Sequence, residues 1–185
     1  YFVSQDVTDC RRSEAIANGQ MRALELGVGG APLAEVLIEL TRSAQKQSAG
    51  VIRAAIMRLD DDGKLRFVES SSLPDDFVRS LDGVDAGSNE TSCSVSVRTG
   101  EPFITPNISV DPHWQRHRAK ALEHGLCACW STPILSANGE VMGTIACYSS
   151  MPSVPTAMEQ EGITLLANTA ALVVQRDRAN RDRSK

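Results

Sequence analysis

The sequence predicts an α+β domain built on an antiparallel sheet. Two apolar runs, 126–135 and 141–148, are joined by a polar Asn-Gly turn whose residues tolerate a positive φ, so they form a hairpin. Segments 51–59 and 65–69 form a second hairpin around a run of three aspartates and a glycine. Helical spacing of apolar residues precedes and follows these strands. The chain therefore mixes separate helices with paired antiparallel strands.

The composition limits the class of protein. A length of 185 residues fits about one domain, and a net charge of -4 with a pI near 5.4 argues against a nucleic-acid-binding surface. No apolar run approaches the roughly 20 residues that span a bilayer, and no secretory signal opens the chain. The five cysteines fit reduced thiols better than a disulfide framework. We therefore expect a cytoplasmic protein that binds neither nucleic acid nor membrane.

The first 30 residues are predicted to be a strand, 1–7, that runs into a helix over 9–26. This helix has a thin apolar stripe, which is typical of a helix that pairs with another helix. The segment YFVSQDVTDCRRSEA resembles the end of a PAS domain, where a final strand leads into a linker helix. We therefore assign 1–30 to a PAS-end strand and a signalling helix, and expect the chain to be a piece of a longer protein.

The central part of the chain is punctuated by short elements. A helix follows Pro32 and packs one face on the core, and short helices are predicted at 75–81 and 91–98, with a strand at 102–105. The polar stretch 70–89 is typical of a lid or binding loop. A further helix is predicted from Asp111 to Gly125, carrying all three histidines of the chain.

The C-terminal helix is predicted to begin after Thr156, which is a good N-cap. Its apolar residues face one side as far as Val174, and this half is expected to pack on the sheet. The charged remainder is expected to project beyond the domain, and we assign 177–185 to the start of a linker helix that leads to a downstream domain.

Three stretches resemble a bacterial subgroup of the GAF domain family: SCSVSVRTGEPFITPNI, DPHW and GLCACWSTPILSANGEVMGTIACYS. The resemblance assigns 31–176 to a GAF domain, in which helices pack on one face of the sheet and loops cover a ligand cavity on the other. Such domains resemble the sensory modules of histidine kinases and cyclic-di-GMP enzymes. Where the subgroup has glycine after its first cysteine, this chain has Ser94, so the loop there is expected to differ.

The candidate ligand contacts lie in or beside these stretches: Cys93, Asn107, Trp114, Cys127, Cys129, Trp130 and Ser131. Strand alternation places Cys127 and Cys129 on one face and Trp130 on the other, without saying which face meets the helices. The two cysteines have three open interpretations, as core packing, as metal ligands or as a redox pair. Packing is favoured, because no histidine lies at a fixed spacing to complete a zinc site.

Cys93 is predicted to lie at the start of a short helix, where a thiolate is favoured. A GAF-type free methionine sulfoxide reductase is an alternative that would use Cys93 with Cys127 or Cys129. The spacing argues against it, since that family places its second cysteine well before the strand proline, whereas Cys127 and Cys129 lie close to Pro133.

His113 and His117 are four residues apart and would share one face of a helix, which suits either a metal or haem contact or a solvated surface. The basic residues around them favour the solvated surface.

The function that these observations favour is a non-catalytic sensory domain. It would bind an unidentified small molecule, form a homodimer through its terminal helices and act between an upstream PAS domain and a downstream effector. A thiol redox sensor and a purely structural dimerisation module are the alternatives. The sequence identifies neither the ligand nor a cofactor.

Overall fold

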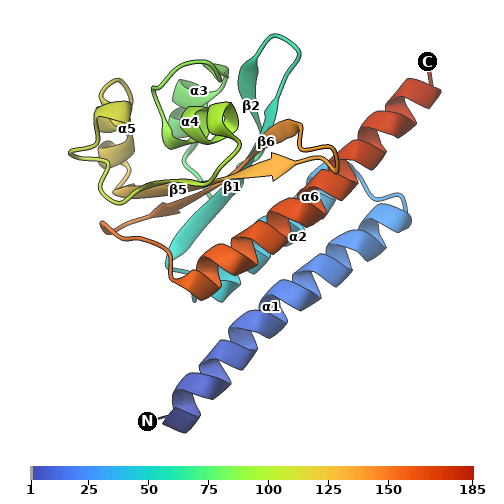
Figure 1. Ribbon diagram of the computed structural model, residues 1–185, viewed down its shortest axis with the longest axis horizontal. Coiled ribbons are helices and arrows are strands. Elements are labelled where there is room, and N and C mark those ends of the chain that lie inside the picture. The colour runs from blue at the N-terminus through green and yellow to red at the C-terminus, as the bar shows by residue number, and fades with distance from the viewer. Residues whose placement is uncertain (1) are drawn as a thin grey trace.

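A computed structural model describes residues 2–185, with side chains described from Val7 onward. One antiparallel sheet divides the molecule into two helical layers (Figure 1). Its strand order is β3-β2-β1-β6-β5-β4, with β1 (Ile52–Leu59), β2 (Lys64–Glu69), β3 (Val84–Asp85), β4 (Phe103–Thr105), β5 (Ala128–Leu135) and β6 (Val141–Ser149). The predicted α+β architecture, with its antiparallel sheet, is confirmed.

Long helices cover one face of the sheet and short helices cover the other (Figure 1). The long helices are α1 (Phe2–Val28), α2 (Leu33–Gln47) and α6 (Ala157–Arg183). The short ones are α3 (Asp75–Leu81), α4 (Ser92–Thr99), the 3₁₀ turn η1 (Pro112–Trp114) and α5 (Arg118–Glu123). We call the segment from α3 to α5 the lid. No helix among the described residues is both long enough and apolar enough to span a bilayer.

The central hairpin is formed by β5 and β6, as expected. Cys129 lies opposite Tyr148 and Trp130 lies opposite Cys147. On the other edge of β6, Gly143 packs so closely on β1 that a Cβ atom there would lie 2.1 Å from the Met57 carbonyl oxygen. A side chain at that position would push the two strands apart.

Two separate cores result, one on each face of the sheet. The helix-side core is mainly aliphatic and includes Leu37, Leu40 and Leu166, together with Trp130 from β5. The lid-side core contains the aromatic rings of Phe77, Trp114 and Tyr148 with the thiols of Cys93 and Cys129. Because side chains alternate along β5, Cys129 lies in the lid-side core and its neighbour Trp130 lies in the helix-side core.

The terminal helices α1 and α6 lie side by side. Gln20 Nε2 on α1 donates to the Leu165 carbonyl oxygen at 3.2 Å and to Thr169 Oγ1 at 3.0 Å on α6. Helix α1 also packs against α2, where a Cβ atom on Gly19 would lie only 1.7 Å from Ser43 Oγ. The missing side chain allows the two helices to approach closely. The start of α1 and the end of α6 lie at opposite ends of the molecule (Figure 1).

The start of α6 is fixed by a reciprocal pair of hydrogen bonds. Thr156 Oγ1 accepts from the Glu159 N–H at 3.1 Å, and Glu159 Oε1 accepts from the Thr156 N–H at 3.1 Å. The helix is continuous through the charged segment, and near its end Arg178 lies 3.8 Å from Asp61 in the β1–β2 turn. The charged part therefore still touches the rim of the domain.

Two predictions about secondary structure are wrong. The strand expected at 1–7 is helical from Phe2, because nothing between Phe2 and Gly29 interrupts the helix; Tyr1 lies outside the described residues. The helix expected from Asp111 to Gly125 is divided into η1 and α5. His113 lies in the first piece and His117 caps the second, so the two histidines do not share one helix face.

Candidate functional site

The site is organised by α4, which packs on β4, β5 and β6 at the centre of the lid side. Thr91 and Ser94 form a capping box: Thr91 Oγ1 accepts from the Ser94 N–H at 3.2 Å, and Ser94 Oγ accepts from the Thr91 N–H at 3.1 Å. The helix ends at Gly100, whose φ is 71°. Ser94 thus replaces the expected glycine with a residue that closes the N-terminus of α4.

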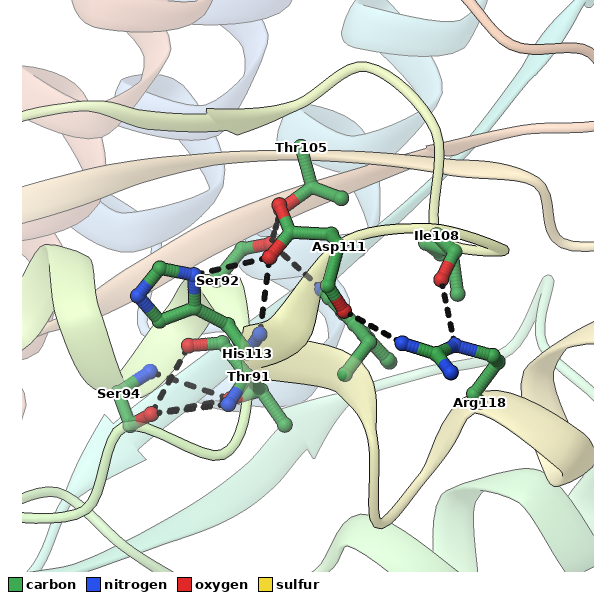
Figure 2. Close-up of polar contacts among 9 residues, drawn as sticks. Thr91, Ser92, Ser94, Thr105, Ile108, Asp111, His113 and Arg118 are labelled. Atoms are coloured by element: carbon green, nitrogen blue, oxygen red, sulfur yellow. Dashed lines mark hydrogen bonds and ion pairs between the residues drawn. The ribbon is translucent and has the colours of Figure 1, made fainter.

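A chain of polar groups runs from the buried lid toward the surface (Figure 2). Trp114 Nε1 donates to Ser92 Oγ at 2.9 Å, and Ser92 Oγ lies 2.8 Å from Thr105 Oγ1. Thr105 also lies close enough to the Asp111 carboxylate to lower its pKa, and Asp111 Oδ1 is 2.8 Å from His113 Nδ1. A tryptophan with no exposed surface is therefore connected to a histidine whose side chain is 32% exposed.

Asp111 links the loop to the histidine in this chain of polar groups, because its carboxylate contacts both the backbone N–H and the ring of His113. It caps η1 by accepting the His113 N–H at 2.9 Å, and its own carbonyl oxygen accepts from Arg118 Nη2 at 2.9 Å. Burial opposes ionisation, but the hydrogen bonds from His113 and Thr105 outweigh it and lower the pKa of Asp111. The carboxylate is therefore held ionised, with the imidazole of His113 oriented beside it.

Beneath α4, four polar side chains meet inside the lid-side core. Cys93 from α4 lies over Cys129 and Ser131 from β5, and Tyr148 is the cross-strand neighbour of Cys129. The rings of Phe77 and Trp114 stand edge-on to Tyr148, with centroids 5.4 and 6.3 Å away. Among the described residues, the buried Tyr148 hydroxyl finds no partner with hydrogen-bond geometry. We call Cys93, Cys129, Ser131 and Tyr148 the thiol cluster.

The cluster separates the pKa values of its two thiols. Contact with the Cys129 thiol lowers the pKa of Cys93 despite its burial, and Ser131 and Tyr148 add to this effect. Burial, followed by the effect of Cys93, raises the pKa of Cys129 well above the usual range. Burial and the two cysteines raise the pKa of Tyr148 in the same way. Cys93 is thus the group of the cluster that ionises most easily.

The structure brings together Cys93, Trp114, Cys129 and Ser131 from the predicted set. It separates Trp130, which faces the helix side and donates from Nε1 to the Ser153 carbonyl oxygen at 3.0 Å.

Two further members of the set lie outside the cluster. Asn107 shapes a turn, with its Oδ1 accepting from the Ser109 N–H at 3.0 Å. Cys127 is half-buried and precedes β5, whose first residue is Ala128. The predicted pair of Cys127 and Cys129 on one strand is therefore not formed, and Cys129 of β5 is instead grouped with Cys93 of α4.

Several site residues were not predicted as contacts. Asp111 and His113 belong to the DPHW stretch, which resembles the GAF family, but only the tryptophan of this stretch was predicted to contact a ligand. Ser92 and Tyr148 lie in the other two stretches, but their partners could not be read from those stretches, because the contacts depend on the packing of α4 and on the register of β5 with β6.

The lid-side face is closed rather than hollow. Cys93, Trp114 and Cys129 have no exposed surface. At the exposed end of the polar chain, a surface pocket of about 390 Å³ is lined by Asn89, Glu90, Pro112, His113, Gln115 and Arg116. The cavity expected from the resemblance is therefore filled by side chains, and a ligand would need the lid to move.

The lid helices α3 and α5 are joined by ion pairs at their exposed edge. Lys120 Nζ lies 3.3 Å from Asp76 Oδ2 and 3.0 Å from Glu123 Oε2, and His124 Nε2 lies 2.7 Å from Asp76 Oδ1. Asp76, Glu123 and His124 have ligand atoms close enough to hold a metal ion. The ammonium group of Lys120 already contacts both carboxylates, so an ion pair network satisfies them.

A sheet with long terminal helices on one face and a lidded polar core on the other defines a class of α+β domains. Within that class, residues 30–175 match the model of the GAF domain family. The chain belongs to this family.

A sensor protein and several solved domains are similar to this chain. The methyl sulfide methyltransferase-associated sensor of Methanosarcina acetivorans is 32% identical over 171 residues, which make up 92% of this chain and 17% of that protein. The chain thus spans less than a fifth of the sensor that it matches.

Two solved domains share the fold. The GAF domain of a phosphoenolpyruvate-protein phosphotransferase from Coxiella burnetii has a TM-score of 0.76 at 15% identity, covering 94% of this chain and 98% of that one. A domain from a Sinorhizobium meliloti protein described as a two-component sensor histidine kinase has a TM-score of 0.65 at 21% identity, covering 82% and 96%.

An enzyme has the same architecture. The free methionine-R-sulfoxide reductase of Neisseria meningitidis has a TM-score of 0.70 at 10% identity, covering 93% of each chain. At such identities the similarity concerns the fold alone, and function depends on the site.

Proposed function

We propose that this chain is a non-catalytic sensory domain that binds a small molecule between the sheet and the lid. The observation that carries the proposal is the Tyr148 hydroxyl, which is buried beside the Cys93 and Cys129 thiols but makes no hydrogen bond of good geometry among the described residues. An unsatisfied buried hydroxyl costs about 1–3 kcal/mol and calls for an explanation. A ligand that accepts this hydrogen bond would supply the partner.

The surrounding side chains define what such a ligand would need. Phe77 and Trp114 offer apolar ring surface, while Tyr148 and Cys93 offer polar hydrogens. The ligand would therefore have a flat apolar body and a hydrogen-bond acceptor at one end. Its entry requires α3, α4 or α5 to move, because the face is closed.

Strand β5 connects the site with the terminal helices. Its lid-side residue Cys129 belongs to the thiol cluster, and its next residue, Trp130, packs in the core that supports α6. Displacement of α4 by a ligand would shift the population of β5 positions and, through them, the packing of α6. The downstream recipient would be a histidine kinase or a cyclic-di-GMP enzyme, and the upstream neighbour a PAS domain.

The test is native mass spectrometry of freshly purified protein, followed by fluorescence titration with any molecule that it retains. The two tryptophans allow a matched comparison: a W130F variant reports on the lid through Trp114, and a W114F variant reports on the helix side through Trp130. We expect binding to change the Trp114 signal first and more strongly. If no molecule is retained and a metabolite library changes neither signal, the proposal fails and a structural module is the better description.

A homodimer through α1 and α6 would carry the signal onward. Exposed apolar side chains recur at a spacing of seven on both helices: Met21 and Val28 are 61% and 70% exposed, and Leu165 and Leu172 are 41% and 59% exposed. Such a spacing is typical of coiled-coil pairing. A groove of about 380 Å³ between α1, α2 and α6 is lined partly by Val28 and Leu172. We propose that a second copy of the chain covers this surface.

Light scattering tests the dimer. An M21E/L172E double variant is expected to be monomeric, since two charges would be buried at the interface. V110E is the matched control, because Val110 is 72% exposed but lies in the lid loop. A monomeric wild-type protein, or equal dissociation by V110E, would contradict the dimer model.

A further inference from the structure

We propose that Cys93 and Cys129 form a reversible disulfide when the domain meets a hydroperoxide, which would tie α4 covalently to β5. This function goes beyond small-molecule binding and does not depend on it. The two cysteines come from elements that pack directly on one another, and both are fully buried in the same core. Neither is paired in the structure, where all five cysteines are free.

The geometry separates this pair from the other cysteines. Cys147 lies on the opposite face of the sheet, in the helix-side core, and Cys10 is exposed on α1. Cys127 is half-buried ahead of β5, where its Sγ lies 3.9 Å from the Gly125 carbonyl oxygen. Among the described residues, Cys93 and Cys129 are therefore the two cysteines that are buried in the lid-side core, on the adjacent elements α4 and β5.

Tyr148 gives the pair a second polar group. Tyr148 is the cross-strand neighbour of Cys129, and its hydroxyl lies beside both thiols without forming a hydrogen bond of good geometry. Burial raises the pKa of this hydroxyl, so it keeps its proton and can donate to a thiolate at Cys93. Cys93 is the second residue of α4, where the helix N-terminus favours a thiolate, whereas Cys129 lies within a central strand. This position, together with the lowered pKa of Cys93, assigns Cys93 as the attacking thiol and Cys129 as the resolving thiol.

The reaction balances in two steps with one equivalent of peroxide. The Cys93 thiolate attacks one peroxide oxygen, the O–O bond breaks, and the leaving oxygen takes a proton, which gives a sulfenic acid and water or alcohol. The Cys129 sulfur then attacks the Cys93 sulfur, the S–O bond breaks, and the hydroxide leaves with the Cys129 proton as water. Both sulfurs are oxidised, and the peroxide is reduced.

Access to the buried pair requires the lid to open. The edge of the lid is held by Lys120, which pairs with Asp76 on α3 and Glu123 on α5, and such exposed pairs contribute little each. Hydrogen peroxide is close in size to water, so a local opening of these short helices is sufficient. Oxidation should therefore depend on lid opening as well as on thiol chemistry.

Peptide mapping of the full chain after treatment with hydrogen peroxide tests the proposal directly. A C10S background removes the exposed thiol. We expect a loss of two hydrogens from the intact mass and one cross-linked peptide that joins Cys93 to Cys129, reversed by dithiothreitol. A cross-link through Cys127 or Cys147, or overoxidation of Cys93 without any cross-link, would overturn the assignment.

Single variants test separately the roles of the two thiols and the role of lid opening. C129A should stop the reaction at the sulfenic acid, which a dimedone probe detects at Cys93, while C147A, also at a buried site, should still form the cross-link. K120A should form it roughly two to five times faster, because the Lys120–Asp76 ion pair across the α3–α5 edge is lost. K64A is the matched control, since Lys64 pairs with Asp85 at 3.7 Å away from the α3–α5 edge. Equal rates for K120A and K64A would contradict the role of lid opening.

The outcome is distinguishable from failure of the small-molecule proposal. Retained ligand is measured in the reduced protein, whereas the cross-link is measured with peroxide alone. A protein that binds a ligand but forms no cross-link would refute only the disulfide.

Discussion

The two cores on either face of the sheet use different chemistry, although the same strands supply both. The helix-side core is mainly aliphatic, and Trp130, its only tryptophan among the described residues, donates to a backbone carbonyl. The lid-side core is built from rings and thiols, and it keeps a tyrosine hydroxyl without a partner. Aliphatic packing between long helices favours one fixed arrangement, whereas a core covered by short helices can open locally. The comparison assigns rigidity to the helix side and adaptability to the lid side.

The largest expected effect comes from the helix side. Leu166 is fully buried between α6 and the sheet, so L166A should lower the free energy of unfolding by about 2–5 kcal/mol. Its neighbour Leu165 is 41% exposed, and L165A should have a much smaller effect. Urea unfolding followed by tryptophan fluorescence and circular dichroism measures both. If L166A changed only the Trp114 signal, the helix side would not be the rigid part.

The next effect has the opposite sign and belongs to the lid side. Y148F removes the unsatisfied hydroxyl, so we expect it to raise the free energy of unfolding by up to about 1–3 kcal/mol. The same variant should weaken retention of the proposed ligand. A protein that is stabilised but binds less well would show that the hydroxyl is kept for function.

W114F is the matched comparison for Y148F. Its indole N–H does have a partner, Ser92 Oγ at 2.9 Å, so this variant should destabilise the protein. If both variants destabilised it to the same extent, the Tyr148 hydroxyl would have to be satisfied in solution.

The smallest effect is a dependence on pH. Burial lowers the pKa of His117, whose side chain is 11% exposed, and nearby Glu90 offsets this only in part. The unfolded chain therefore binds a proton more readily, so stability is fully present above the ordinary histidine pKa of about 6.5 and falls as the pH drops below it. The melting temperature should decline between about pH 7 and 5, and H117Q should flatten this part of the profile. An unchanged slope in H117Q would assign the titration to another group.

Much of the fold followed from local pattern. The central hairpin, the helix at Asp75–Leu81 and the capped start of α6 were predicted within a few residues, because turn and cap residues act through neighbours in the chain. The initial strand was wrong, since β-favouring residues near the N-terminus are absorbed into a helix that nothing interrupts before Gly29. The strand propensity of these residues was therefore outweighed by the helix that continues through them.

The candidate site was only half predictable. Alternation showed that Cys129 and Trp130 face opposite ways, but it gives no absolute direction, and only the packed structure shows that Trp130 meets the helices. Tyr148 could not be selected without the register that places it beside Cys129. The contact between Cys93 and Cys129 joins residues 36 positions apart, which no local spacing encodes.

The close contact between Gly19 and Ser43 has a consequence for how α1 can move. Only the position without a side chain fits against α2, since a Cβ atom there would lie 1.7 Å from Ser43 Oγ. Turning α1 by one residue, about 100°, would bring Asn18 or Gln20 to the same point and force the helices apart. The contact at Gly19 therefore fixes the angle at which α1 packs on α2. We expect the domain to respond more to a rotation of α1 about its own axis than to a change in the length of the helix.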